Sequence, residues 1–299
     1  MRSIINLINF LENLGQRFLH PKNRTYKYYS LDKNKFISPT QRQLKRLINV
    51  VNYENEYFRK VDKICQKINV HKIIDIGSNI GYWSYAFSKS DDLNREVIAF
   101  EPDIRNLFYA AHNLHKCKNI SLFHLGLSDE YGRFKVSMPK DILKRKKEGR
   151  YNTGLLTALD NQSLQGSHFL IGDKFLESIN INPLDIACIK IDVEGFEYKV
   201  INGLQRTLAL TNAIMIIEIN PITIKKAGIT FNYLINNLMS YGFKSLMDPT
   251  LQIKFKDGAP NGSFNLLACK DNIYKECKRI MNYIDVPLWI GKKFIFFEY

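Results

Sequence analysis

The chain has 299 residues, of which 45% are hydrophobic and 24% are charged. These values exclude a wholly disordered chain, and the length suffices for one large α/β domain with a small appendage. The formal charge of +14 favours acidic partners such as nucleic acid, an anionic membrane surface or an acidic substrate, although a lysine-rich composition that only keeps the protein soluble explains it equally well.

The first 68 residues are expected to form a helical extension. Residues 1–20 carry an apolar stripe at helical spacing, 21–39 read as an irregular connection, and a second helix is predicted from about Gln41 to Ile68. Charges and amides interrupt the first stripe too often for a membrane span, and no cleavage site marks a signal peptide. We expect this stripe to pack on the main domain or on a second subunit of a homo-oligomer; peripheral contact with a membrane is the alternative.

From His71 the chain alternates β-branched runs with helical stretches, the pattern of βαβ units around a parallel sheet. Strands are expected at 72–76, 96–101, 119–125, 186–192, 213–219 and 243–246, with a hairpin over 133–138. A turn-rich lead-in predicts that the last strand, 263–269, is antiparallel. A basic helix at 272–285 and an aromatic tail follow. The predicted division is therefore an extension (1–68), a domain (69–271) and a terminal helix with its tail (272–299).

The cysteines indicate a reducing compartment. There are five of them and no two have C-x-x-C spacing, which argues against a disulfide framework or a zinc site: Cys65, Cys117, Cys188, Cys269 and Cys277. We therefore expect a cytoplasmic protein.

The turn after the first strand is the most informative segment. Its glycines, Gly77 and Gly81, let the backbone approach a ligand closely, and the helix that follows favours an anion. A dinucleotide-binding turn has its first two glycines two residues apart, whereas here they are four apart and Asp75 precedes them. That carboxylate repels a pyrophosphate but suits the ammonium group of a methionine. The turn therefore predicts S-adenosylmethionine (SAM) rather than NAD, bound through Asp75, Gly77, Ser78, Asn79 and Gly81.

Two further positions are expected to contact the cofactor. Glu101 ends the second strand, 24 residues beyond Gly77, where a carboxylate can accept both ribose hydroxyls. Ser128 and Asp129 follow the third strand, at the carboxyl edge of the sheet where ligands bind, and can hydrogen-bond the adenine. An ordinary turn explains Ser128 and Asp129 equally well.

Carboxylates gather after the fourth and fifth strands. Asp192 and Glu194 are the predicted catalytic residues, because a carboxylate there can take a proton from a substrate hydroxyl. Such oxygens also suit a divalent metal, for which Asp192 and Glu218 are the candidate ligands. If no metal binds, Glu218 is expected to be a second carboxylate of the site or to contact the substrate. A purely structural explanation is that Glu218 is a buried acid whose oxygens accept hydrogen bonds from local backbone N–H groups.

These segments together resemble the FkbM family of SAM-dependent methyltransferases. The matching segments are 75–84, Phe100-Glu101-Pro102, Leu127-Ser128-Asp129, 189–197, 217–220 and 265–268, in the family's order and at comparable intervals. The run Lys190-Ile-Asp-Val-Glu-Gly is the most specific. The resemblance covers about residues 70–270 and implies a Rossmann-like class I fold, with a seven-stranded, mostly parallel sheet, and O-methylation, often of sugar or polyketide hydroxyls.

The resemblance is looser over 137–185, where Ile171-Gly172-Asp173 replaces a Thr-Leu-Asp-like strand. This segment is expected to touch the acceptor, so the departure leaves the acceptor open. The basic stretch 144–150 is either a solvated turn or a handle for an acidic substrate.

The sequence thus predicts methyl transfer from SAM to a hydroxyl of a carbohydrate, glycolipid or related small molecule. The charge of +14 keeps an RNA or cap methyltransferase as the alternative, although no zinc knuckle, aromatic RNA-binding strand or base-methylating motif supports it. A non-catalytic binding module on the same fold is the third hypothesis.

Overall fold

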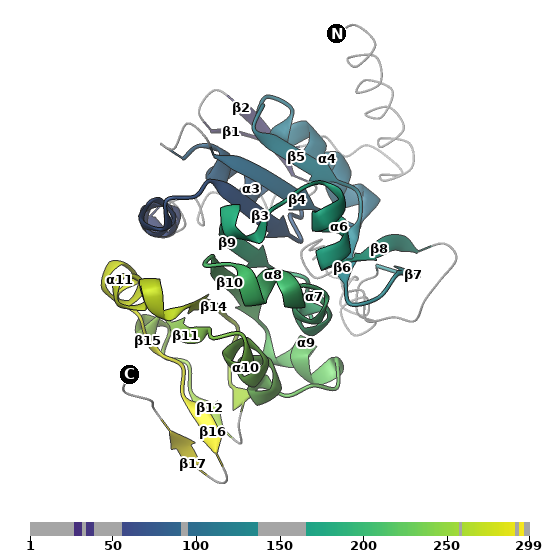
Figure 1. Cartoon of the computed structure of the whole chain (residues 1–299). Coiled ribbons are helices and arrows are strands. Elements are labelled where there is room, and N and C mark those ends of the chain that lie inside the picture. Colours follow the sequence, from purple (N-terminus) through teal and green to yellow (C-terminus); the bar gives the residue numbers. More distant parts are fainter. Residues whose placement is uncertain are drawn as a thin grey trace, which may run out of the picture.

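A mixed eight-stranded sheet forms the centre of the computed structural model, which describes residues 27–31, 34–38, 56–90, 95–136, 166–256, 259–290 and 293–295. Figure 1 shows this sheet, with the strand order β15-β11-β14-β10-β9-β3-β4-β5. Its parallel part consists of β3 (Lys72–Ile76), β4 (Glu96–Phe100), β5 (Ile120–Phe123), β9 (Ile186–Ile191) and β10 (Ile214–Ile219). The predicted α/β class is confirmed.

The other edge of the sheet is antiparallel. Strand β14 (Phe264–Cys269) lies between β10 and β11 (Lys244–Met247) and runs antiparallel to both, as its turn-rich lead-in predicts. The sheet has one strand more than the predicted seven, because the two-residue strand β15 (Ile284–Asp285) pairs with β11. The terminal helix consequently ends earlier than predicted, at Met281.

Helices cover both faces of the sheet, which explains the continuous apolar strands. All six residues of β9 are buried, as expected for a strand covered on both sides. One face packs against α6 (Gly172–Ser178), α7 (Glu197–Gly203), α8 (Gln205–Leu210) and α10 (Phe231–Ser240). The other packs against residues 56–68, α3 (Tyr82–Ser88) and α11 (Asp271–Met281), with α4 (Ile104–Leu114) beside α3.

The helix at 56–68 and α11 belong to the core of the domain. Val61 and Ile64 are fully buried, and Asp62 of the same helix pairs with the buried Arg95 at 2.6 Å. Cys277 of α11 is also fully buried. The predicted boundaries at 68 and 271 therefore mark changes in sequence pattern, while the packing continues across them.

The segment 21–39, predicted as irregular, contains an antiparallel strand pair, β1 (Lys27–Leu31) and β2 (Asn34–Ser38). That prediction was wrong because the Lys-rich composition concealed two aromatic and β-branched runs around Asp32-Lys33. Strand β2 lies beside α4. The helix predicted in residues 1–20, the first part of the one predicted from Gln41, and the basic stretch 144–150 lie outside the described residues.

A second, three-stranded sheet stands at the carboxyl edge of the main one. It consists of β6 (Gly126–Ser128), β7 (Gly132–Phe134) and β8 (Ser167–Ile171) in the order β6-β8-β7. The predicted hairpin at 133–138 is therefore replaced by pairing of β7 with β8, which the chain reaches after 137–165. Figure 1 shows β6, β7 and β8 together beside α6 and α7.

The remaining elements are short. They are η3 (Pro183–Asp185), α9 (Pro221–Lys226), η4 (Pro249–Leu251), the pair β12 (Phe255–Lys256) and β13 (Ala259–Pro260), and the pair β16 (Leu288–Ile290) and β17 (Lys293–Ile295) within the expected tail. Among the described residues, no helix is long and apolar enough to cross a bilayer.

Candidate functional site

A cavity opens at the carboxyl ends of β3, β4 and β9, where an open α/β sheet binds its ligands. Residues from six segments line it: Ile76, Gly77, Asn79, Phe100, Glu101, Pro102, Asn106, Gly126, Leu127, Val136, Phe169, Asp192, Val193, Glu194 and Phe196.

The predicted cofactor turn forms one wall of the cavity. Gly77, Asn79 and Gly81 have φ angles of +81°, +53° and +85°, in the left-handed region that glycine and asparagine tolerate. Gly77 has a second reason to be glycine, because a Cβ atom there would lie 1.9 Å from the carbonyl oxygen of Asp192. The turn therefore presses directly against the end of β9. Ser78 is buried beside Gly77, and no donor or acceptor among the described residues reaches its hydroxyl.

Asp75 lies behind this wall, fully buried and outside the lining of the cavity. Its Oδ2 accepts a hydrogen bond from Ser84 at 2.5 Å, and its Oδ1 lies 3.4 Å from Nζ of Lys190. The same ammonium lies 3.4 Å from Oδ2 of Asp192. Burial lowers the pKa of Lys190, but Asp192, Asp75 and Glu218 outweigh burial and raise it. Lys190 is thus a permanent cation that joins the cofactor turn to the carboxylates.

Glu101 follows β4 and lines the cavity with only 4% of its surface exposed. Its Oε2 accepts the backbone N–H of Asn79 and its Oε1 that of Asp103, each at 2.8 Å. The side chain of Asn106 also hydrogen-bonds to it. Burial is the main reason that the pKa of Glu101 is raised to about 8.

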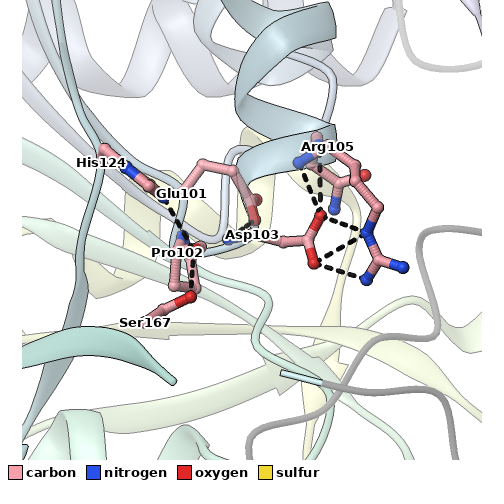
Figure 2. A network of polar contacts seen from close by, with 7 residues as sticks. Glu101, Pro102, Asp103, Arg105, His124 and Ser167 are labelled. Atoms are coloured by element: carbon pink, nitrogen blue, oxygen red, sulfur yellow. Dashed lines mark hydrogen bonds and ion pairs between the residues drawn. The ribbon is translucent and has the colours of Figure 1, made fainter. Parts of the chain in front are cut away.

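The turn that carries Glu101 is fixed from several sides (Figure 2). Asp103 caps α4 by accepting the N–H of Arg105 at 2.9 Å, and it also pairs with the Arg105 guanidinium. The carbonyl oxygen of Pro102 accepts the hydroxyl of Ser167 at 2.5 Å and lies 3.2 Å from Nε2 of His124. Strand β8 is therefore tied to the turn beside Glu101.

The opposite end of the cavity is apolar and is closed by β6 and β8. A Cβ atom on Gly126 would lie 2.2 Å from the ring of Phe169, so glycine makes room for this ring. Phe169 packs edge-on against Phe134 and Phe196, with ring centres 5.1 Å and 5.2 Å away. Sequence reasoning missed this aromatic wall, because its members come from three separate segments.

Ser128 and Asp129 lie next to this end but do not line the cavity. Ser128 is fully buried, and Asp129 lies 3.3 Å from Nζ of Lys199 on α7. Their role at the adenine stays a prediction.

Asp192, Glu194 and Glu218 come together at the third side of the cavity. Each offers a carboxylate oxygen, and these oxygens all lie within 4.8 Å of one another. Asp192 and Glu194 line the cavity. Glu194 has a φ angle of +51° and precedes Gly195 at +100°, an uncommon turn that positions its side chain. The arrangement could hold a divalent cation or share protons.

The three acids differ in their affinity for a proton. Burial raises the pKa of Asp192, but Lys190 and a hydrogen bond from Glu218 outweigh it, so this pKa is lowered. The negative charge of Asp192, and then burial, raises the pKa of Glu218 well above its usual range. Glu218 therefore keeps its proton and donates a hydrogen bond to the Asp192 carboxylate.

Glu194 is the third acid, and burial followed by the charges of Asp192 and Glu197 raises its pKa to about 8. The side chain of Asn220 hydrogen-bonds to it. Oδ1 of Asn220 accepts the N–H of Ile222 at 3.1 Å, as the N-cap of α9, which leaves the amide NH₂ to donate to Glu194. No donor among the described residues reaches Oε2 of Glu194.

Asn106, Lys190 and Asn220 were not predicted as site residues. Asn106 lies in the first turn of α4, three residues after Asp103, and Asn220 directly precedes Pro221. Asparagine is common at helix starts, so the sequence offers no reason to expect a further role. The contacts of Asn106 with Glu101 and of Asn220 with Glu194 appear only in the structure.

Comparison with known proteins identifies the domain. Residues 75–245, more than half of the chain, match the methyltransferase FkbM domain. No curated protein matches the sequence.

Several solved methyltransferases are similar in structure at low sequence identity. The methyltransferase FkbM of Methylobacillus flagellatus is 16% identical with a TM-score of 0.41; the match covers 67% of this chain and 43% of that one, so this chain spans less than half of that protein. The precorrin-6y C5,15-methyltransferase of Geobacter metallireducens is 14% identical, with a TM-score of 0.37 and coverage of 70% and 88%. An O-methyltransferase of Bacillus cereus in complex with SAH is 10% identical, with a TM-score of 0.36 and coverage of 87% and 97%.

Proposed function

The chain belongs to the FkbM family of SAM-dependent methyltransferases, and from this premise we propose that it methylates a hydroxyl group of a carbohydrate, glycolipid or related small molecule. The observation that carries this proposal is the cavity-lining carboxylate of Glu194, whose Oε2 has no donor among the described residues. A hydroxyl acceptor must give up its proton, and a carboxylate oxygen without a partner is a suitable acceptor for it.

The residues of the cavity fit SAM. At Gly77 the turn presents backbone and no side chain to the cavity, and Asn79 lines the cavity beside it. Glu101 offers acceptor oxygens for a ribose, and the apolar end beside Phe169 suits a flat ring. When bound, SAM supplies a methyl group on a sulfonium, which the acceptor oxygen attacks in line. Gly77, Asn79 and Glu101 bind and orient the cofactor in this proposal, with Ser78, Gly81, Ser128 and Asp129 as further predicted contacts, and Asp75 holds the turn from behind through Lys190.

We propose that Glu194 takes the proton of the acceptor hydroxyl while Asp192 stays ionised beside it. Asp192 is a poor proton acceptor, because Lys190 and Glu218 both stabilise its charge. Its negative charge, like that of Glu197, makes Glu194 more basic. Two carboxyls whose pKa values are pushed apart by their surroundings are a common way to divide such roles, and a base with a pKa near the working pH accepts a proton efficiently.

A divalent metal held by Asp192, Glu194 and Glu218 is the alternative use of this cluster. The Lys190 ammonium, 3.4 Å from Oδ2 of Asp192, already neutralises one of these ligands and would repel a dication. We therefore favour the proton-transfer role, and chelation tests it.

The acceptor is tested with SAM labelled in its methyl group. We expect the purified protein to label a carbohydrate or glycolipid fraction of a cell extract, in a bond that survives mild alkali as an ether does and an ester does not. Mass spectrometry of the product should locate the added methyl group on oxygen. Label that enters RNA and is released by nuclease would replace this proposal with the RNA alternative. Absence of SAM binding in calorimetry would instead favour the non-catalytic hypothesis.

We further propose a cytoplasmic location. The support is that all five cysteines are free, four of them buried, and none paired in a disulfide.

A further inference from the structure

The carboxylate of Glu101 already has several hydrogen-bond donors. The backbone N–H groups of Asn79 and Asp103 each donate to one of its oxygens at 2.8 Å, and the side chain of Asn106 adds a further bond. Even a fully ionised carboxylate has about four acceptor positions, and a protonated one has fewer. With three of them used by the protein, Glu101 retains at most about one for a ligand.

The ribose of SAM presents two neighbouring hydroxyls, and each needs an acceptor once it is removed from water. Glu101 by itself therefore satisfies only one of them. This differs from the expectation from the sequence alone, in which Glu101 accepts both hydroxyls. A second acceptor has to come from a residue beside Glu101.

Oδ1 of Asn106 has the properties that this acceptor requires. Asn106 is only 2% exposed and lines the cavity. Its amide bonds to Glu101, and no donor among the described residues reaches its Oδ1. A buried acceptor left without a partner is costly, so such an atom in a binding cavity indicates a missing ligand donor.

The backbone holds Asn106 in this position. Its N–H donates to Oδ1 of Asp103 at 3.2 Å in the first turn of α4, and Asp103 is itself held by Arg105 (Figure 2). The side chain thus starts from a fixed point directly beside Glu101.

We propose that Asn106 is a second ribose-binding residue, whose Oδ1 accepts one hydroxyl of the cofactor while Glu101 accepts the other. This inference rests on the proposed function, because it requires SAM to bind in this cavity. It assigns the vicinal diol to two different side chains.

Calorimetry with S-adenosylhomocysteine (SAH) and its 2′-deoxy and 3′-deoxy analogues tests this assignment. In the wild-type protein each analogue should bind about tenfold more weakly than SAH, the usual effect of one buried hydrogen bond to a ligand. In Asn106→Leu, which keeps the branched shape of the side chain, one of these two penalties should fall below about twofold while the other persists. Glu101→Gln should reduce the opposite penalty more strongly.

The control is Asn119→Ala, because Asn119 is half-buried and donates to Ser88 and Arg95 carbonyl oxygens away from the cavity lining. It should keep both penalties. Asn106→Ala provides the same measurement if the leucine variant does not fold.

Persistence of both penalties in the Asn106 variants would overturn the inference. Loss of both together would also overturn it, because Asn106 would then only support Glu101. Failure of the wild-type protein to bind SAH at all would contradict the proposed function, and the inference with it.

Discussion

Where we propose that the cofactor binds, backbone geometry holds the groups that line the cavity, whereas at the carboxylate end the acids hold one another through charge. Gly77 and Asn79 form their wall through positive φ angles and a close approach to β9. Asp192, Glu194 and Glu218 owe their protonation states to burial, to Lys190 and to their mutual repulsion. The first end should therefore be sensitive to added volume, and the second to changes of charge that preserve shape.

The largest expected effect is that of Gly77→Ala. Its Cβ atom would meet the Asp192 carbonyl at 1.9 Å in a backbone conformation with φ +81°, so we expect a loss of about 3 kcal/mol in the free energy of unfolding. Affinity for SAH should fall by about 100-fold or more. Denaturant unfolding and calorimetry measure the two effects.

Gly228→Ala is the matched control, because Gly228 has φ +74° but no atom within 4 Å of the added Cβ. It should cost only about 1 kcal/mol, from the backbone alone, and leave SAH affinity unchanged. Equal losses in the two variants would refute the importance of the contact with β9.

Glu194→Gln should leave the cofactor end intact and remove the proton acceptor. We expect the rate of methyl transfer to the labelled extract fraction to fall about 100-fold, with SAH affinity within about twofold of wild type. Glu177→Gln is the control, since Glu177 is exposed, lies outside the cavity lining and pairs with Lys174 at 3.6 Å. An unimpaired Glu194→Gln enzyme would remove Glu194 from the mechanism.

Asn220→Asp separates the cap of α9 from the contact with Glu194. Aspartate caps a helix as well as asparagine does, but it places a negative charge where the amide donates to Glu194. The rate should fall about tenfold with unchanged stability. Thr230→Ala, which removes the cap of α10, should show the reverse: a loss of about 1 kcal/mol in stability and an unchanged rate.

The pH dependence of stability compares the two ends directly. Burial raises the pKa of both Glu101 and Glu194 from 4.5 to about 8, so the unfolded chain binds fewer protons than the folded one between these values. Their contribution to stability is complete below pH 4.5 and is lost as the pH rises through about 8. Calorimetric Tm should fall by a few degrees over this window, and Glu101→Gln should reduce the slope. A Tm that rises from pH 5 to 8 equally in both proteins would contradict the assignment.

The smallest expected effect is that of chelation. Since the Lys190 ammonium faces Asp192, we expect EDTA to change the rate of methyl transfer by less than about twofold. If activity is lost and Mg²⁺ or Mn²⁺ restores it, the carboxylates are a metal site.

The sequence alone was sufficient to predict the class of the fold and several of the residues that line the cavity. The strand pattern predicted the parallel sheet and the antiparallel β14, because burial on one or both faces of a strand shows directly in residue type. The turn Gly77–Gly81 could be recognised because positive φ angles restrict the choice of residue. The sequence pattern did not predict β1 and β2, because lysines surround their aromatic residues.

Only the tertiary structure decided which of these residues line the cavity and how their affinity for a proton is shifted. Asp75 lies behind the cavity because Lys190, 115 residues later in the chain, pairs with it. Oδ1 of Asn106 and Oε2 of Glu194 have no donor among the described residues only because of the particular neighbours that the fold gives them. Burial and charge coupling depend on residues that are distant in sequence, so no local pattern contains them.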